Sequence, residues 1–192
     1  MSSSTKPLTN IGLIVLAWQI AGGWKAVIRE KDFQLSLVVW LLCSPMWLSF
    51  DWWSQPISVL PNLLGFTLGG FAIFLGFGND DFRSMIVAAD EKKAEYLSVS
   101  AAFLLFVAAQ VIALVWALVC AALWKLPVPD ALYKWIDIID IATKIGWGIG
   151  YLIFIYSLFL SLRAALRIFR LSRWYNAFLS ADSNSSNDDN KG

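Results

Sequence analysis

The stretch Tyr96–Trp124, YLSVSAAFLLFVAAQVIALVWALVCAALW, decides the fold class of this chain. It contains no Asp, Glu, Lys or Arg, and alanine and branched aliphatic residues make up most of it. A helix needs about 20 apolar residues to cross the roughly 30 Å hydrocarbon core of a bilayer, at about 1.5 Å per residue. The stretch therefore predicts a membrane-spanning helix that is longer than the core and must tilt or project from one face.

Three further charge-free windows follow the same pattern. The four expected spans cover about 33–50, 57–78, 97–124 and 145–162. Pro45 lies near the end of the first window and predicts a kink there. Pro61 lies early in the second window, where a first-turn proline is tolerated because its missing N–H would have no helical partner. The predicted fold class is an all-α integral membrane protein, a four-span helical bundle.

The composition of the whole chain supports that class and disfavours most others. Of the 192 residues, 58% are hydrophobic and 15% are charged, against roughly 45–50% and 25% in soluble proteins. The chain has no histidine, which excludes Ser-His or Cys-His catalysis and His-ligated metal within it. A net charge of +1 argues against nucleic acid as a partner. We expect no enzyme activity, no cofactor and no metal site.

The N-terminal region, residues 1–32, contains a shorter apolar stretch at Ile11–Trp24, IGLIVLAWQIAGGW. Its length is more typical of an interfacial or re-entrant helix than of a span. We therefore expect an amphipathic or re-entrant helix before the four-span domain of residues 33–178. Two alternatives stay open, a fifth span within residues 11–28 and a cleaved signal peptide.

Lysine and arginine set the expected orientation, because they are enriched in cytoplasmic loops. With both termini in the cytoplasm, most basic residues fall inside and only Lys125, Lys134 and Lys144 fall outside. The fourth helix is expected to continue into the cytoplasm over residues 163–178, and the polar tail 179–192 is expected to be disordered. A bacterial inner membrane is the default location.

Small residues form three faces that could bring helices together in lipid, where close backbone approach replaces the hydrophobic effect. The second window carries Gly65, Gly69, Ala72 and Gly76; the third carries Ala109, Ala113, Ala117 and Ala121; the fourth carries Gly146 and Gly150. Packing within one bundle and packing between subunits both remain open. Three such faces in a small protein make a homo-oligomer plausible.

A few neutral polar side chains lie at membrane depth, where they are costly and face protein or water. They are Gln110 near the centre of the third window, with Asn62, Thr67, Ser157 and Ser161 in the second and fourth. As hydrogen-bonding partners between helices each would contribute about 0.6–2 kcal/mol. A pore-lining role for Gln110 is the alternative. No window holds a charged residue, so ion-coupled transport is not expected.

A basic stripe follows the fourth window at helical spacing. It consists of Arg163, Arg167, Arg170 and Arg173. These arginines come after a run already long enough to cross the membrane, which disfavours a voltage sensor. We expect them to bind anionic lipid of the inner leaflet, with an acidic soluble protein as the alternative partner.

Tryptophans are abundant, and most fall near the predicted ends of spans, where indole rings anchor helices at the membrane interface. Only Trp40 and Trp116 lie deep within a window. We expect these two to face lipid or to pack between helices.

Three functions fit this pattern. The first is a homo-oligomeric membrane component, with pore formation as one variant, controlled through its cytoplasmic helices. The second is a non-conducting anchor or sensor that docks a soluble cytosolic partner; its size and topology look like those of small subunits of bacterial defence or envelope-stress systems. The third and least supported is a small-solute carrier, since four spans form a complete transporter only as an oligomer.

Overall fold

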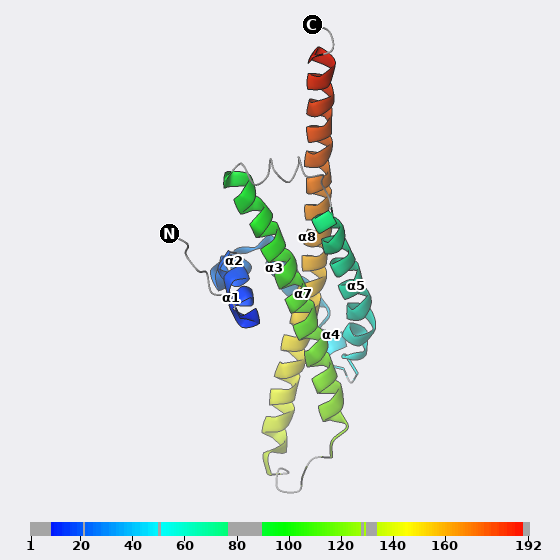
Figure 1. Cartoon of the computed structure of the whole chain (residues 1–192). Coiled ribbons are helices and arrows are strands. Elements are labelled where there is room, and N and C mark those ends of the chain that lie inside the picture. Colours follow the sequence, from blue (N-terminus) through cyan, green and yellow to red (C-terminus); the bar gives the residue numbers. More distant parts are fainter. Residues whose placement is uncertain are drawn as a thin grey trace, which may run out of the picture.

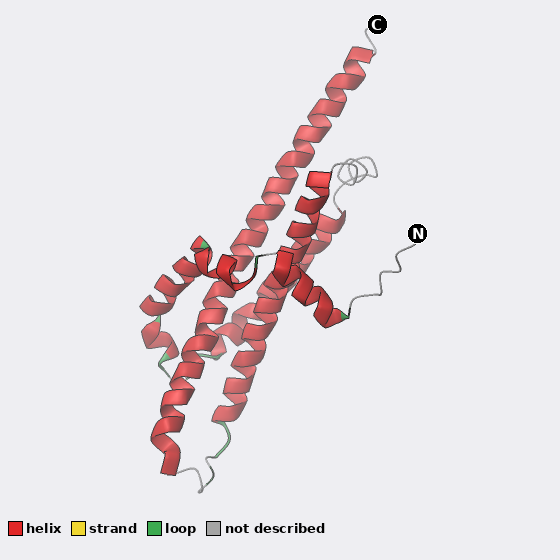
Figure 2. Ribbon diagram, turned by 90° about the vertical axis from the view of Figure 1, so that its left-hand side faces the viewer, coloured by secondary structure: helices red, strands yellow, loops and turns green. Residues whose placement is uncertain are grey.

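A computed structural model of the chain describes residues 9–20, 22–49, 51–76, 90–127, 129 and 134–189. These ranges are helical apart from short connections and contain no strand (Figure 2). The helices are α1 (Asn10–Ile20), α2 (Gly23–Arg29), α3 (Lys31–Leu42), α4 (Ser44–Trp47), α5 (Ser54–Gly76), α7 (Asp90–Trp124) and α8 (Ile136–Asp189).

Three long helices form the body of the molecule. α7 and α8 run antiparallel, α5 packs against both, and α8 projects well beyond the rest of the described chain (Figure 1). Their segments Ser54–Ile73, Val99–Trp124 and Ile136–Arg170 are long and apolar enough to cross a membrane. The prediction of a helical chain compatible with a multi-pass membrane protein is confirmed. These segments also contain most of the second, third and fourth predicted spans.

The first predicted span, residues 33–50, is not one continuous helix. α3 ends at Leu42, and Cys43 separates it from the four-residue helix α4, with Pro45 in the first turn of α4. A proline cannot continue a helix smoothly, because it lacks the N–H and its ring meets the preceding turn. The 12 residues of α3 extend only about 18 Å. The four-span bundle is therefore not confirmed.

The N-terminal helices α1 and α2 are bent by 51° relative to each other. The bend lies at Gly22 and Gly23, whose φ angles of 89° and 65° favour glycine because a side chain would clash there. Taken together the two helices could make a broken span or a re-entrant loop, which would raise the number of candidate spans to four. The structure therefore leaves open whether this region spans the membrane or forms a re-entrant segment.

Two boundaries differ from the sequence prediction. α5 begins at Ser54, so Pro61 lies inside the helix instead of in its first turn. α8 remains helical to Asp189, through most of the tail expected to be disordered from residue 179. Adding residues to an existing helix is far easier than nucleating a new one, so the long helix α8 can extend into the polar tail. Residues 77–89 lie outside the described residues.

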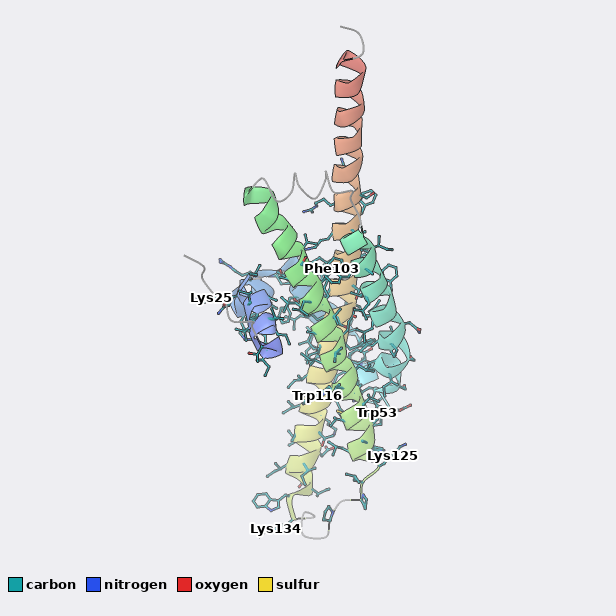
Figure 3. All side chains as sticks on the ribbon, in the orientation of Figure 1. Lys25, Trp53, Phe103, Trp116, Lys125 and Lys134 are labelled. Carbon is teal, nitrogen blue, oxygen red and sulfur yellow. The ribbon has the colours of Figure 1, made fainter. Side chains whose placement is uncertain are left out.

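The buried side chains form two apolar clusters along α7 and α8. The tryptophan cluster consists of Trp52, Trp53, Leu60, Ala113, Ala117, Trp147, Tyr151, Phe154 and Ile155. The phenylalanine cluster consists of Ala102, Phe103, Phe106, Leu160 and Ala164. In Figure 3, Trp53 and Trp116 lie towards the end marked by Lys125 and Lys134, and Phe103 lies towards the opposite end. Four buried polar side chains lie between the two clusters: Thr67, Gln110, Ser157 and Ser161.

Candidate functional site

A buried polar layer joins the three long helices. Gln110 of α7 is fully buried. Its Nε2 donates hydrogen bonds to Thr67 Oγ1 of α5 at 3.1 Å and to Ser161 Oγ of α8 at 2.6 Å. One amide group thus contacts both neighbouring long helices at the same level.

The hydroxyl groups of this layer donate their own hydrogens to backbone carbonyls. Thr67 donates to the Leu63 carbonyl at 2.9 Å, and Ser161 donates to the Ser157 carbonyl at 2.9 Å. Neither hydroxyl can therefore also donate to Gln110 Oε1, which has no hydrogen-bond partner within the described chain. A buried acceptor without a donor costs about 1–3 kcal/mol. The layer is a set of interhelical contacts with one unsatisfied oxygen.

Four of the five predicted polar residues meet in or beside this layer. Ser157 is buried next to it and donates to the Phe154 carbonyl at 2.7 Å. Asn62 is separate from it, because its side chain is exposed and reaches the Ser58 carbonyl of its own helix at 3.4 Å. The chain itself surrounds Gln110 on all sides. This geometry favours a packing role for Gln110 over a pore-lining role.

The alanine face of α7 is used inside the molecule. Ala113 and Ala117 are buried in the tryptophan cluster, and Ala109 and Ala121 are partly buried beside the apolar clusters. Small side chains here let α7 approach its neighbours closely. This face has no surface left for a second subunit at its two central positions.

The glycines of α8 accommodate indole rings instead of another helix backbone. A Cβ atom placed on Gly150 would clash with the indole ring of Trp116, and one placed on Gly148 would lie 3.3 Å from Cζ2 of Trp40. Trp116 Nε1 donates to the Gly146 carbonyl at 3.0 Å. Trp40 Nε1 donates to the Gly148 carbonyl at 2.8 Å. The two deep tryptophans therefore attach α3 and α7 to the α8 backbone, which agrees with the expected packing between helices.

The glycine face of α5 is different, because it points away from the bundle. It consists of Gly65, Gly69, Ala72 and Gly76, all exposed. A Cβ atom placed on any of its three glycines would have no neighbour within 4 Å in the described chain. The adjacent Gly70, by contrast, faces Ile168 of α8. Of the three predicted small-residue faces, the α5 face is the one that the described chain leaves open.

The basic stripe is divided by the structure. Arg163 is partly buried, and its Nη1 lies 2.6 Å from Glu30 Oε1, while its Nη2 lies 2.5 Å from Asp32 Oδ2. Tyr156 donates to the second oxygen of Glu30 at 3.4 Å. We call Arg163, Glu30, Asp32 and Tyr156 the arginine clamp. The predicted role of Arg163 in lipid or partner binding therefore needs correction, because two carboxylates of its own chain already occupy its guanidinium.

The remaining arginines of the stripe keep a different environment. Arg167 is half-buried one turn after Arg163, and Arg170 and Arg173 are exposed. Among the described residues no carboxylate forms an ion pair with any of these three. They remain able to interact with a group from outside the chain.

The clamp also explains how the N-terminal helices are held. Glu30 and Asp32 lie at the junction of α2 and α3, and the Arg163–Asp32 contact joins residues 131 positions apart. Opposite charges beside the first and fourth windows could have suggested the pairing, since both fall at the same predicted end of the bundle. Which carboxylate would reach which arginine depends on how α3 packs against α8.

The charged and aromatic ends of the molecule are separated by a membrane-like distance. The α8 backbone rises about 24 Å from Trp147 to Arg163. The rings of Trp53, Trp124 and Trp147 lie within 6.1 Å of one another at the aromatic end. Tryptophans at one boundary and charged groups at the other are typical of helices that cross a bilayer.

Comparisons with protein-family models, with curated proteins and with solved structures give no match to this chain. Within the described ranges, no group of three or more His, Cys, Asp or Glu residues is placed to hold a metal ion.

Proposed function

We propose that this chain is a small multi-pass membrane component that self-associates through the glycine face of α5. The observation that supports this most directly is the open space at Gly65, Gly69 and Gly76. In lipid, helices associate where small residues allow two backbones to approach, and these glycines lie at the spacing that favours such contact. The other two small-residue faces already have partners in the same chain.

The same proposal includes four membrane crossings, with α3 and α4 forming one kinked span. Asp32 pairs with Arg163, while Trp40 donates to the Gly148 carbonyl, so α3 packs along α8. α3 rises only about 12 Å from Asp32 to Trp40, and α4 must extend this segment for it to cross a hydrocarbon core of about 30 Å. The excess of basic residues near the arginine clamp would place that end, and both termini, in the cytoplasm of a bacterial cell.

In this proposal the subunit does not conduct through its own centre. Gln110, Thr67 and Ser161 join the three long helices directly, and the apolar clusters close the bundle above and below them. Any conducting path would have to run between subunits. The anchoring alternative therefore gains weight relative to a pore.

A second candidate function, docking of a soluble partner, is favoured by the projecting part of α8. Beyond the clamp this helix extends away from the bundle (Figure 1) and carries the exposed Arg170 and Arg173. An exposed basic helix can bind an acidic protein surface, because opposite charges guide the encounter. Self-association in the membrane and docking outside it are compatible, since they use different faces.

The oligomeric mass of the protein in nanodiscs or mild detergent tests the main proposal. We expect a defined oligomer for the natural chain and a monomer for Gly69→Leu, because the larger side chain separates the two backbones. Ala122→Leu is the matched control, since Ala122 is exposed on α7 outside the proposed face. A monomeric natural chain, or a Gly69→Leu variant with unchanged mass, would contradict the proposal.

The docking candidate requires a separate measurement. Retention of acidic cytosolic proteins by the immobilised protein should fall for Arg170→Glu with Arg173→Glu, while the oligomeric mass stays unchanged. Ion flux through liposomes distinguishes the pore variant from the anchor. Ion-tight oligomers that retain a partner would support anchoring, and flux that Gly69→Leu abolishes would support a pore between subunits.

A further inference from the structure

A cavity of about 340 Å³ lies between α1, α5 and α7. α1 contributes Leu13, Leu16 and Ala17, α5 contributes Phe71, and α7 contributes Leu104 and Val107 among others. Every lining side chain except Ser100 is apolar. Water needs several polar partners to occupy a protein cavity, so this one suits a hydrocarbon ligand.

The cavity lies within the membrane-spanning part of α7, at the end that carries the arginine clamp. Its α7 residues, Ser100 to Val107, begin one residue after the start of the candidate span at Val99. Phe103, which lines it, packs with Leu160 and Ala164 of α8, and Ala164 follows Arg163 directly. The cavity is therefore at the depth of the lipid chains in the leaflet on the clamp side.

The clamp helps to determine the outer wall of this cavity. It joins the α2–α3 junction to α8, and the turn at Gly22 and Gly23 then directs α1 back against α7. Ala17 of α1 is 4% exposed at this contact. α1 thus forms one wall of the cavity, and the arginine clamp and the Gly22–Gly23 turn hold it in that position.

The cavity is open to the surroundings of the bundle. Leu13, Leu68 and Leu104 line it and are also 46%, 50% and 38% exposed. For a helix bundle in a bilayer, such an opening faces lipid chains. An acyl chain can enter sideways without crossing a polar barrier.

One basic residue at the same end of the bundle as the cavity, Arg167, indicates the kind of lipid. Ile168 of α8 packs against the phenylalanine cluster together with Phe71, which lines the cavity. Arg167 precedes Ile168, is half-buried, and forms no ion pair with a described carboxylate. An arginine in this position can pair with a phosphate group through two parallel hydrogen bonds.

We propose that this cavity binds one acyl chain of an anionic phospholipid from the leaflet on the clamp side, with Arg167 near its headgroup. The occupant follows from the apolar lining, the lateral opening and the unpaired cation at the same end of the bundle. The proposal rests on the membrane location of the chain. It does not depend on self-association, so its test and the oligomeric-mass test fail independently.

Photo-crosslinking in nanodiscs tests the site. The probes are phosphatidylglycerol and phosphatidylcholine, each with a diazirine in one acyl chain and each present at the same low mole fraction. Mass spectrometry of the digested protein then locates the labelled residues. We expect labelling concentrated on Ser100–Val107 and on α1, and about fivefold more with phosphatidylglycerol, as one basic residue near an anionic headgroup implies.

Variants make the result specific. Leu104→Trp should fill the cavity and remove the labelling of α1 and α7, whereas Leu118→Trp, at an exposed position further along α7, should leave it. Ala101→Leu provides a second filled variant, and far-UV circular dichroism confirms that each variant is folded. Arg167→Gln should remove the preference for phosphatidylglycerol while the labelled positions stay the same.

Three outcomes would overturn the proposal. Labelling spread evenly over all exposed α7 residues would mean that only surrounding bulk lipid was detected. Unchanged labelling in both folded, filled variants would show that the cavity is not the site. Equal labelling by the two probes would overturn the assignment of an anionic headgroup to Arg167.

Discussion

The glycine pair on α8 and the glycine pair on α5 have the same spacing but different surroundings. Gly146 and Gly150 lie against Trp116, whereas Gly65 and Gly69 face open space. The same contrast applies to arginine and to side-chain amides. Arg163 is paired and Arg170 is exposed, and Gln110 is buried while Asn62 is exposed. Each comparison therefore sets one site that contacts the chain's own helices against one that faces outward.

A sequence motif such as GxxxG or an arginine stripe therefore indicates that its residues can make contacts. It does not indicate which group they contact. In lipid, apolar side chains gain little by leaving their surroundings, so shape and hydrogen bonding select the contacts. A glycine can accommodate a second helix or an indole ring equally well. The matched pairs allow the difference to be measured with identical substitutions at both positions.

The largest expected effect is at the arginine clamp. Arg163→Gln removes the cation between Glu30 and Asp32 and leaves two partly buried carboxylates without it. We expect a loss of about 2–3 kcal/mol in the free energy of unfolding, below the 3–5 kcal/mol of fully buried pairs because these groups are partly exposed. Unfolding in mixed micelles with increasing SDS, followed by circular dichroism, measures it.

Arg170→Gln is the matched control for the clamp, and its expected effect is within about 0.5 kcal/mol, as for other exposed positions. Equal effects of the two substitutions would show that the clamp contributes nothing beyond a surface charge. A triple variant that adds Glu30→Gln and Asp32→Asn to Arg163→Gln should recover part of the loss, since it removes the unpaired carboxylates.

The second-largest expected effect is a difference in stability between the same substitution at the two glycine pairs. Gly150→Ala places a Cβ atom against Trp116 and Trp52, and crowding of this kind costs about 1–3 kcal/mol. Gly69→Ala meets no neighbour and should stabilise the monomer by up to about 1 kcal/mol through helix propensity. Thermal unfolding monitored by tryptophan fluorescence compares the two. A stabilising Gly150→Ala would refute the assignment of this glycine to the indole rings.

The smallest effect is expected in the polar layer. Gln110→Leu removes two hydrogen bonds but also removes the unsatisfied Oε1, and Thr67 and Ser161 keep their backbone partners. We expect a loss of no more than about 1 kcal/mol, near the average for hydrogen bonds between membrane helices. Asn62→Leu, outside the bundle, should change stability by less. A much larger loss at Gln110 would indicate that its Oε1 has a donor in the membrane.

Several elements of the fold were predictable because their signals are local. The window 97–124 lies within α7 and matches the candidate span Val99–Trp124 closely. The windows 57–78 and 145–162 likewise correspond to parts of α5 and α8. In the window 33–50 Pro45 predicted a kink, but hydropathy did not show that the helix is interrupted at Cys43 and divides into α3 and α4.

The site was predictable only in part. The sequence identified Gln110, Thr67 and Ser157 as intramembrane polar groups, and the structure brings Gln110 and Thr67 together across 43 positions. The sequence analysis placed Arg163 with the other arginines of the basic stripe. Spacing along one helix cannot show that Glu30 and Asp32, near the start of another helix, pair with it. The attachment of Trp40 and Trp116 to glycine carbonyls was missed for the same reason.

The sequence alone determined that this protein is helical and suited to lipid. Hydrocarbon requires long apolar segments whose backbone groups bond within the segment, and both requirements can be read along a single stretch of chain. Only the tertiary structure decided which glycines, arginines and amides face the chain itself and which face outward. Which residues face inward depends on side-chain shape and on hydrogen bonds between helices far apart in the sequence. In lipid the hydrophobic effect does not drive apolar faces together, so hydropathy alone does not predict these contacts.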